Sequence, residues 1–270
     1  MDIKAIMCDL DGTLLTSNGT VSINTITAIR QAKEKGILFG LSTGRDVHSV
    51  KNLLDEWGIH ELVDAIVGTG GGELCDFTLC KEESCYPLSG EFMKEIIKHY
   101  EDLDVNFVIP WQGILYAPWE DDHIRKLSDA DHIPYKIVDF SHFLEKSRPK
   151  LMITCAPQTM ESVIARSATF SNTSYKSAAL VTASILFEYT DPRITKTMGL
   201  KKLLSWHGWD MENLCAFGDE DNDYDMIMHA GIGVVMKNGS ALTKSAADFI
   251  TDDNDHDGIG KFINHCILRQ

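Results

Sequence analysis

Three clusters of polar residues follow short apolar runs in this sequence. They occupy residues 9–13 (DLDGT), 42–45 (STGR) and 218–223 (GDEDND). In an open α/β sheet, ligands bind beyond the carboxyl ends of the strands, so clusters that are distant in sequence can meet at one edge. Carboxylates gathered there would repel one another; the candidates are Asp9, Asp11, Asp219 and Asp223. A hard divalent cation such as Mg²⁺ would relieve that repulsion, because it prefers oxygen ligands and keeps waters that a phosphate can replace.

The first cluster contains two carboxylates that can take different chemical roles. Asp9 and Asp11 are two residues apart, so near a strand end their side chains can point to the same side. A metal on Asp9 would keep that carboxylate ionised, whereas Asp11 could carry a proton. The pair would then supply a nucleophile and a general acid. A single D-x-D-G-T is equally typical of an ordinary strand-to-turn junction, but G-D-x-x-N-D after an apolar run is costly to bury without a ligand.

Alternating strand and helix patterns predict the elements that position these clusters. The strand patterns cover residues 3–10, 37–42, 65–67, 214–217 and 232–235. The helical patterns cover residues 22–35, 47–57, 199–207 and 223–230. Strands that alternate with helices in this way predict a parallel sheet covered by helices.

The middle of the chain has a different pattern. Helical spacing at residues 91–100 and 159–168 is combined with strand patterns at 105–109, 113–117, 150–155 and 185–189, and a turn is expected at residues 110–112. We therefore predict an α/β domain formed by residues 1–86 and 190–270, with an α+β segment, residues 87–189, inserted into it. Each predicted crossing contains a proline, Pro87 or Pro192.

These motifs resemble those of the haloacid dehalogenase (HAD) superfamily of phosphatases, in the Cof-type group with a large inserted cap. Residues 9–15 are similar to the nucleophile motif, 42–45 to the second motif and 218–223 to the acidic fourth motif. Lys196 stands where the family has its catalytic lysine, although Thr195 and Thr197 flank it in place of the usual Ser-Lys-Gly. The resemblance covers both core segments. It implies a Rossmann-like parallel sheet core and a cap that selects the substrate.

The resemblance also implies roles for individual residues. Asp9 would attack the phosphorus atom, and Asp11 would protonate the leaving alcohol and then deprotonate the attacking water. The residues expected to bind the phosphoryl group or the substrate are Thr43, Gly44, Arg45, Lys196 and Asn222. Mg²⁺ would be held by the side chains of Asp9 and Asp219 and the backbone carbonyl of Asp11, with Asp223 in support. For Arg45, a substrate contact, a cap contact and a structural ion pair are all open.

The predicted function is Mg²⁺-dependent hydrolysis of small phosphomonoesters, most consistent with sugar phosphates, through an aspartyl-phosphate. A phosphosugar mutase would use the same intermediate and is an alternative. A non-enzymatic phospho-switch of the receiver type is a weaker one, because receivers place the phosphorylated aspartate on a middle strand. Asp253, Asp255 and Asp257 match the beginning of an EF-hand loop, but its twelfth position is Asn264, which favours a solvated turn.

Composition limits the partners and the compartment. The chain has 270 residues and a net charge of −15, which argues against binding nucleic acid or an anionic membrane by bulk charge. No apolar run approaches the roughly 20 residues that span a bilayer, and the N-terminus lacks a signal-peptide pattern. The seven cysteines form no C-x-x-C pair. We therefore expect a cytoplasmic protein, a monomer or weak homo-oligomer, whose partner is a small phosphorylated metabolite.

Overall fold

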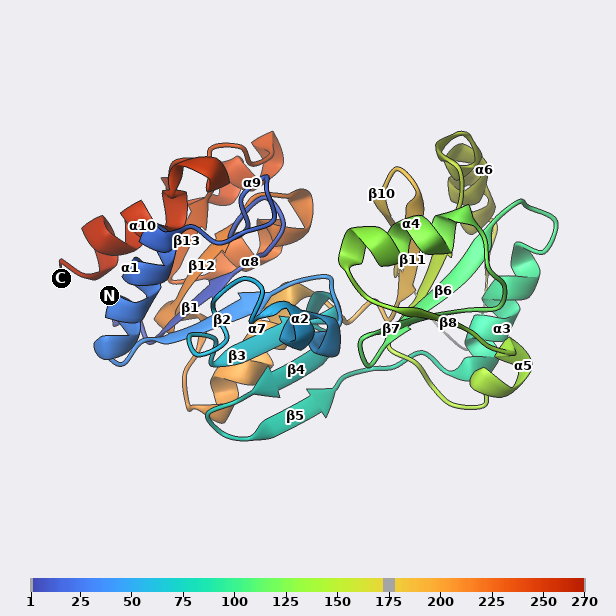
Figure 1. Cartoon of the computed structure of the whole chain (residues 1–270), viewed down its shortest axis with the longest axis horizontal. Helices are drawn as coiled ribbons and strands as arrows, with labels where there is room; N and C mark the ends of the chain where they lie inside the picture. Colours follow the sequence, from blue (N-terminus) through green and yellow to red (C-terminus); the bar gives the residue numbers. More distant parts are fainter. Residues whose placement is uncertain (1, 172–177, 270) are drawn as a thin grey trace. The chain divides into compact units, whose positions relative to one another are not determined.

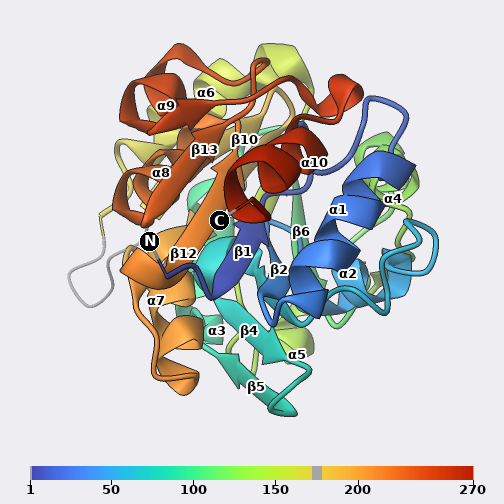
Figure 2. The same ribbon diagram turned by 90° about the vertical axis from the view of Figure 1, so that its left-hand side faces the viewer.

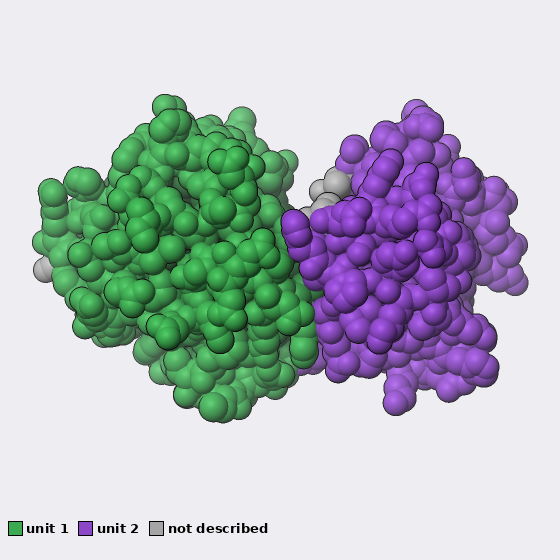
Figure 3. Space-filling model, in the orientation of Figure 1, with its two compact units in different colours: residues 1–83, 195–270 green, residues 84–194 purple. Residues whose placement is uncertain are grey.

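The structure is a computed structural model that describes residues 2–171 and 178–269 (Figure 1). The chain divides into two compact units (Figure 3). Unit 1 comprises residues 1–83 and 195–270, and unit 2 comprises residues 84–194. Each unit is built around its own sheet and its own apolar core.

Unit 1 contains a mainly parallel sheet. Among the described residues its strand order is β14-β13-β12-β1-β2-β3-β4-β5. The parallel strands are β1 (Ala5–Cys8), β2 (Leu38–Ser42), β3 (Ala65–Gly68), β12 (Leu214–Gly218), β13 (Ile232–Val235) and β14 (Phe249–Ile250). The edge that follows β3 holds β4 (Glu73–Asp76), which is antiparallel to β3, and β5 (Lys81–Ser84). The predicted α/β class with a parallel core sheet is confirmed, with this antiparallel extension as an addition.

Helices cover both faces of the sheet in unit 1 (Figure 2). They are α1 (Ile23–Glu34), α2 (Val47–Leu53), α7 (Lys196–Trp206), α8 (Tyr224–His229), α9 (Ala241–Ala246) and α10 (Gly258–Phe262). Helix α1 begins where Ser22 accepts a hydrogen bond from the Thr25 N–H. Gly36, at φ +81°, follows its end and adopts the left-handed conformation that glycine tolerates best. The larger differences from the predicted helix boundaries are that α2 already ends at Leu53 and that α7 already begins at Lys196.

Unit 2 contains a mixed sheet with the order β10-β11-β9-β6-β7-β8 among the described residues. The strands are β6 (Asn106–Trp111), β7 (Ile114–Ala117), β8 (Tyr135–Ile137), β9 (Leu151–Thr154), β10 (Ala178–Ala183) and β11 (Leu186–Thr190). The helices are α3 (Gly90–His99), α4 (Asp122–Asp131), α5 (Phe140–Phe143) and α6 (Pro157–Ser167). The turn predicted at residues 110–112 was misplaced: Pro110 and Trp111 belong to β6, and the chain turns at Gln112 and Gly113, both at positive φ.

None of the helices in the described residues combines the length and the apolar character that a bilayer-spanning helix requires.

Candidate active site

The adjacent strands β1 and β12 bring the first and third polar clusters together. Cys8 and Phe217 are partners in the parallel register, and the Asp9 N–H donates to the Phe217 carbonyl at 2.9 Å. Asp9 directly follows β1, and Asp219 directly follows β12. Both carboxylates therefore leave the sheet at its carboxyl edge, as expected for neighbouring parallel strands.

Lys196 joins these acids from the first turn of α7. Its side chain is buried, and Nζ lies 2.5 Å from Asp9 Oδ1 and 2.6 Å from Asp223 Oδ1. One ammonium thus bridges two carboxylates that come from opposite ends of the sequence. Such charge-assisted hydrogen bonds are among the strongest polar contacts in proteins.

Two glycines allow α7 to approach the turn that follows β3. A Cβ atom on Gly71 would lie 2.0 Å from the Thr195 carbonyl oxygen, and one on Gly199 would lie 2.7 Å from Val67 Cγ1. Gly199, three residues after the lysine, is used for this close packing. Residues 68–72 therefore form a tight turn that supports the lysine helix.

Asp223 organises the loop that carries Asp219. It is fully buried, and its Oδ2 accepts hydrogen bonds from the backbone N–H groups of Asp219 at 3.0 Å and Glu220 at 3.2 Å. Its Oδ1 accepts from Lys196. With both oxygens engaged, Asp223 fixes the lysine relative to the backbone at Asp219.

The first cluster reaches Asp219 directly through Gly12 and Thr13. Thr13 Oγ1 donates to Asp219 Oδ1 at 2.6 Å. Gly12 has φ +80°, and a Cβ atom there would lie 2.4 Å from Asp219 Oδ2. Asn238 Nδ2 donates to the Gly12 carbonyl at 2.8 Å, a contact that sequence reasoning missed. Its only signal was an Asn-Gly pair shortly after a strand, which also marks an ordinary turn.

The buried cluster carries more negative than positive charge. Asp9, Asp219 and Asp223 have carboxylate oxygens within 4.8 Å of one another, and Lys196 supplies one positive charge. Burial, reinforced by neighbouring carboxylates, raises the pKa of Asp9 to about 7 and that of Asp219 to about 6, although Lys196 opposes both shifts. Burial alone would lower the Lys196 pKa, but Asp9 and Asp223 outweigh it and raise the pKa.

A divalent cation fits this donor set. The three carboxylates exceed the one ammonium by two negative charges, and oxygen is the donor that Mg²⁺ prefers. Such a cation would balance the cluster and keep its acids ionised. The identity of the cation as Mg²⁺ is inferred from the family and from this chemistry.

Asp11 lies outside the buried cluster. Its side chain is 61% exposed, and both oxygens are held by Arg45, whose Nε and Nη2 lie 3.1 Å and 3.0 Å from them. Of the three possibilities for Arg45, the structure contains an ion pair, and its partner is Asp11. The two residues expected to handle the proton and the substrate thus contact each other.

The second cluster is held by the backbone of the 68–72 turn. The Thr69 N–H donates to the Arg45 carbonyl at 2.8 Å, and the Gly70 N–H donates to the Thr43 carbonyl at 2.9 Å. Thr43 is buried and its hydroxyl accepts from the Arg45 N–H at 3.2 Å, whereas Gly44 is exposed. Asn222 is also exposed, in the short helical turn Asp221–Asp223.

Comparison with known proteins agrees with this arrangement. A family model described as haloacid dehalogenase-like hydrolase matches residues 6–263. The chain is 29% identical over 277 residues to the 5-amino-6-(5-phospho-D-ribitylamino)uracil phosphatase YcsE of Bacillus subtilis, covering 99% of this chain and 97% of the relative. It is 26% identical to the pyridoxal phosphate phosphatase YbhA of Escherichia coli, covering 97% and 98%.

A solved structure shares the whole fold. The crystal structure of a haloacid dehalogenase-like hydrolase from Bacteroides thetaiotaomicron superposes with a TM-score of 0.87 at 26% identity, covering 97% of this chain and 98% of that one. The match extends through both units. The chain therefore belongs to the haloacid dehalogenase-like hydrolases, in the Cof-type group with a cap, and is a phosphatase of small phosphomonoesters.

Proposed function

We propose that this chain hydrolyses sugar phosphates and that Asp9 is the nucleophile. The observation that carries the proposal is the contact of Lys196 with both Asp9 and Asp223, next to Asp219, at one edge of the sheet. Phosphoryl transfer depends mainly on positioning and on neutralising charge. A buried lysine beside three carboxylates provides fixed groups for both tasks.

In the first step an Asp9 oxygen forms a bond to phosphorus while the bond from phosphorus to the ester oxygen breaks. Asp11 donates a proton to that oxygen, so the product leaves as an alcohol. Because Arg45 now holds both Asp11 oxygens, a protonated Asp11 must release at least one of these hydrogen bonds. Arg45 would then be able to donate a hydrogen bond to the substrate.

In the second step Asp11 takes a proton from water, and the water oxygen bonds to phosphorus as the Asp9–phosphorus linkage breaks. Inorganic phosphate leaves and Asp9 is regenerated. Lys196, Thr43 and the backbone N–H of Gly44 would bind the phosphoryl oxygens, and Asn222 would orient the substrate. A cation held by Asp9, Asp219, the Asp11 carbonyl and Asp223 would neutralise charge on the phosphoryl group.

The substrate class is supported by what similar proteins act on. The substrate named for YcsE carries its phosphate on a ribityl chain, and that named for YbhA is pyridoxal phosphate. Both are small phosphorylated metabolites. A sugar phosphate shares the phosphorylated polyhydroxy chain of the first, and unit 2 would select among such compounds.

A substrate panel tests this proposal. Phosphate release should be measured with Mg²⁺ and with a chelator, on sugar phosphates, nucleotides, pyridoxal phosphate and p-nitrophenyl phosphate. We expect Mg²⁺-dependent release that is fastest with a sugar phosphate. If a nucleotide were turned over faster than every sugar phosphate, nucleotides would be the substrate class instead. Isomer formation without phosphate release would favour a mutase. No release from any compound would overturn hydrolysis itself.

A further inference from the structure

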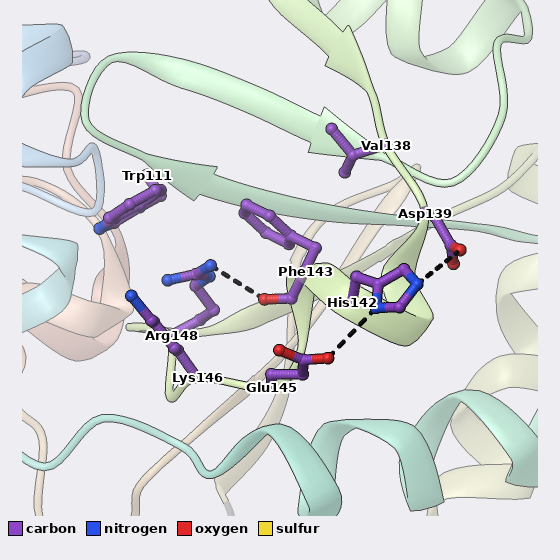
Figure 4. A pocket seen from close by; sticks show the side chains of 8 residues that line it. All are labelled: Trp111, Val138, Asp139, His142, Phe143, Glu145, Lys146 and Arg148. Carbon is purple, nitrogen blue, oxygen red and sulfur yellow. Dashed lines mark hydrogen bonds and ion pairs between the residues drawn. The ribbon is translucent and has the colours of Figure 1, made fainter.

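Unit 2 contains a cavity of about 410 Å³ that the hydrolysis described above does not use (Figure 4). It lies between the end of β6, the segment that follows β8, and helix α5 with the residues after it. The lining residues are Trp111, Val138, Asp139, His142, Phe143, Glu145, Lys146 and Arg148. Aromatic and aliphatic side chains thus meet cationic ones, a combination typical of small-molecule sites.

Arg148 is the unusual member of this lining. It is only 7% exposed, yet its guanidinium is paired with no carboxylate among the described residues. The group lies over two rings, with Cζ 4.2 Å from the centre of Trp111 and 4.0 Å from that of Phe143. Cation–π contacts of this kind partly compensate a desolvated charge but do not neutralise it.

The guanidinium also has hydrogen-bonding capacity that the chain leaves unused. Nη2 donates to the Phe143 carbonyl at 2.9 Å, while Nε is buried and has no acceptor in the described part of the chain. Buried donors of this type normally find a partner. Arginine remains charged even in apolar surroundings, so deprotonation does not remove the imbalance.

A neighbouring residue shows how the same unit pairs a buried cation. Lys150, two residues later and 4% exposed, lies 2.8 Å from Glu188. Arg148 has no such carboxylate partner among the described residues, although the chain as a whole carries a net charge of −15.

The acids that line the cavity are occupied by other groups. Asp139 accepts a hydrogen bond from the Ser141 N–H at the start of α5, and Glu145 Oε1 lies 3.1 Å from His142 Nδ1. Both carboxylates are mostly exposed, so water screens their charge. Lys146 adds a second positive charge to the lining.

We propose that this cavity binds a small organic anion whose carboxylate or phosphate group pairs with Arg148 and whose apolar part lies against the rest of the lining. Arginine suits this role because its planar fork matches both anionic groups. The inference goes beyond the proposed hydrolysis, because it concerns binding within unit 2 and requires neither Mg²⁺ nor turnover.

Binding to the full chain without Mg²⁺ tests the proposal, with the indole N–H resonance of Trp111 as the readout. The probes are benzoate, phenylphosphonate and the neutral benzamide. We expect at least one anion to shift the resonance saturably, with benzamide at least about tenfold weaker. The tighter of the two anions identifies the preferred group. Equal binding of benzamide and the anions, or no shift with any probe, would overturn the proposal.

Two variants localise the effect. Arg148→Met should weaken anion binding at least about tenfold. Arg125→Met removes an exposed arginine of the same unit, which pairs with Glu120 and Asp122, and should leave binding unchanged. Undiminished binding by folded Arg148→Met would contradict the proposal. If that variant does not fold, Arg148→Lys replaces it. The comparison of charged and neutral probes on the unaltered protein then still tests whether the cavity prefers an anion.

Discussion

Lys196 in unit 1 and Arg148 in unit 2 are both buried cations, but the groups around them differ. In unit 1, Lys196 lies between the carboxylates of Asp9 and Asp223, with Asp219 nearby. In unit 2, Arg148 lies over two adjacent aromatic rings, and no carboxylate of the described residues pairs with it. The first cluster has an excess of negative charge, whereas in the second the positive charge of Arg148 lacks a carboxylate partner among the described residues. The sign of each unpaired charge indicates the ligand that would complete it.

The choice of residue fits each setting. Lysine presents a compact ammonium with three donors that can bridge separate carboxylates. Arginine presents a flat group that stacks on rings and keeps donors at its edge. Burying either positive charge without a partner of opposite charge destabilises the folded chain. A bound cation in unit 1 and a bound anion in unit 2 are therefore expected to stabilise the chain.

The largest effect is expected from Asp9→Asn, which keeps the shape of the side chain but removes the nucleophilic carboxylate. We expect kcat for p-nitrophenyl phosphate to fall at least about 10³-fold, as for other nucleophiles. Asp102→Asn is the matched control, because it removes an exposed carboxylate from unit 2. Full activity of Asp9→Asn, or an equal loss in the control, would remove the basis for assigning the chemistry to unit 1.

The contrast between the two cations predicts different effects on stability. Lys196→Met leaves Asp9 and Asp223 without their cation and should lower the free energy of unfolding by about 3–5 kcal/mol. Arg148→Met leaves no carboxylate unpaired and loses mainly the ring contacts and one hydrogen bond to the Phe143 carbonyl, so its cost should remain below about 2 kcal/mol. Urea denaturation of both variants measures the difference. An equal loss of unfolding free energy in the two variants would mean that the surroundings of Lys196 and Arg148 do not differ as described.

The raised pKa values predict how pH and metal act together. Asp9 at about 7 and Asp219 at about 6 bind protons more tightly in the folded chain than in the unfolded chain, where the value is near 3.8. The metal-free protein should therefore lose stability as pH rises from about 4 through about 7. Mg²⁺ competes with these protons, so its stabilising effect should grow over the same interval.

Thermal unfolding with Mg²⁺ or a chelator measures this coupling. At a Mg²⁺ concentration of 100 times Kd, the gain in stability should be about 2.7 kcal/mol. A gain that is independent of pH, or one that shrinks as pH rises, would show that the cation does not bind to these carboxylates.

The smallest effect is expected at Gly12. A Gly12→Ala variant adds backbone strain at φ +80° and a Cβ atom 2.4 Å from Asp219 Oδ2. Gly19→Ala is the control, because Gly19 has φ +72° but no neighbour within 4 Å of such a Cβ atom. Each should lose about 1–2 kcal/mol from the strain, and only Gly12→Ala should also weaken Mg²⁺ binding. Equal Mg²⁺ affinity in the two variants would separate Gly12 from the metal site.

The sequence was sufficient to predict that the polar clusters of unit 1 gather at one edge of the sheet, because each cluster follows one of its strands. Strand pairing alone brings Asp9 and Asp219 to the same edge. The pairing of Asp11 with Arg45 and the contact of Asn238 with Gly12 were not predictable, since each joins side chains or loops from different elements. In neither case does the residue type or its spacing in the sequence identify the partner.

Unit 2 was less predictable for two physical reasons. Helix α4 and strand β8 lie in a polar stretch with few apolar residues, and β8 is short, so tertiary packing determines them. Arg148 stands between Ser147 and Pro149 and resembles any surface charge in the sequence. Only the fold shows that it is buried and flanked by Trp111 and Phe143.

The central claim is that Asp9, Asp219 and Asp223 form one site for a metal cation beside Lys196. Calorimetric titration with Mg²⁺ tests this claim most directly. We predict one Mg²⁺ per chain, with binding strongly weakened in Asp219→Asn. Binding should be unchanged in Asp255→Asn, which alters the acidic turn at residues 253–257. Full binding by folded Asp219→Asn, or its loss in Asp255→Asn, would place the cation elsewhere and contradict the account.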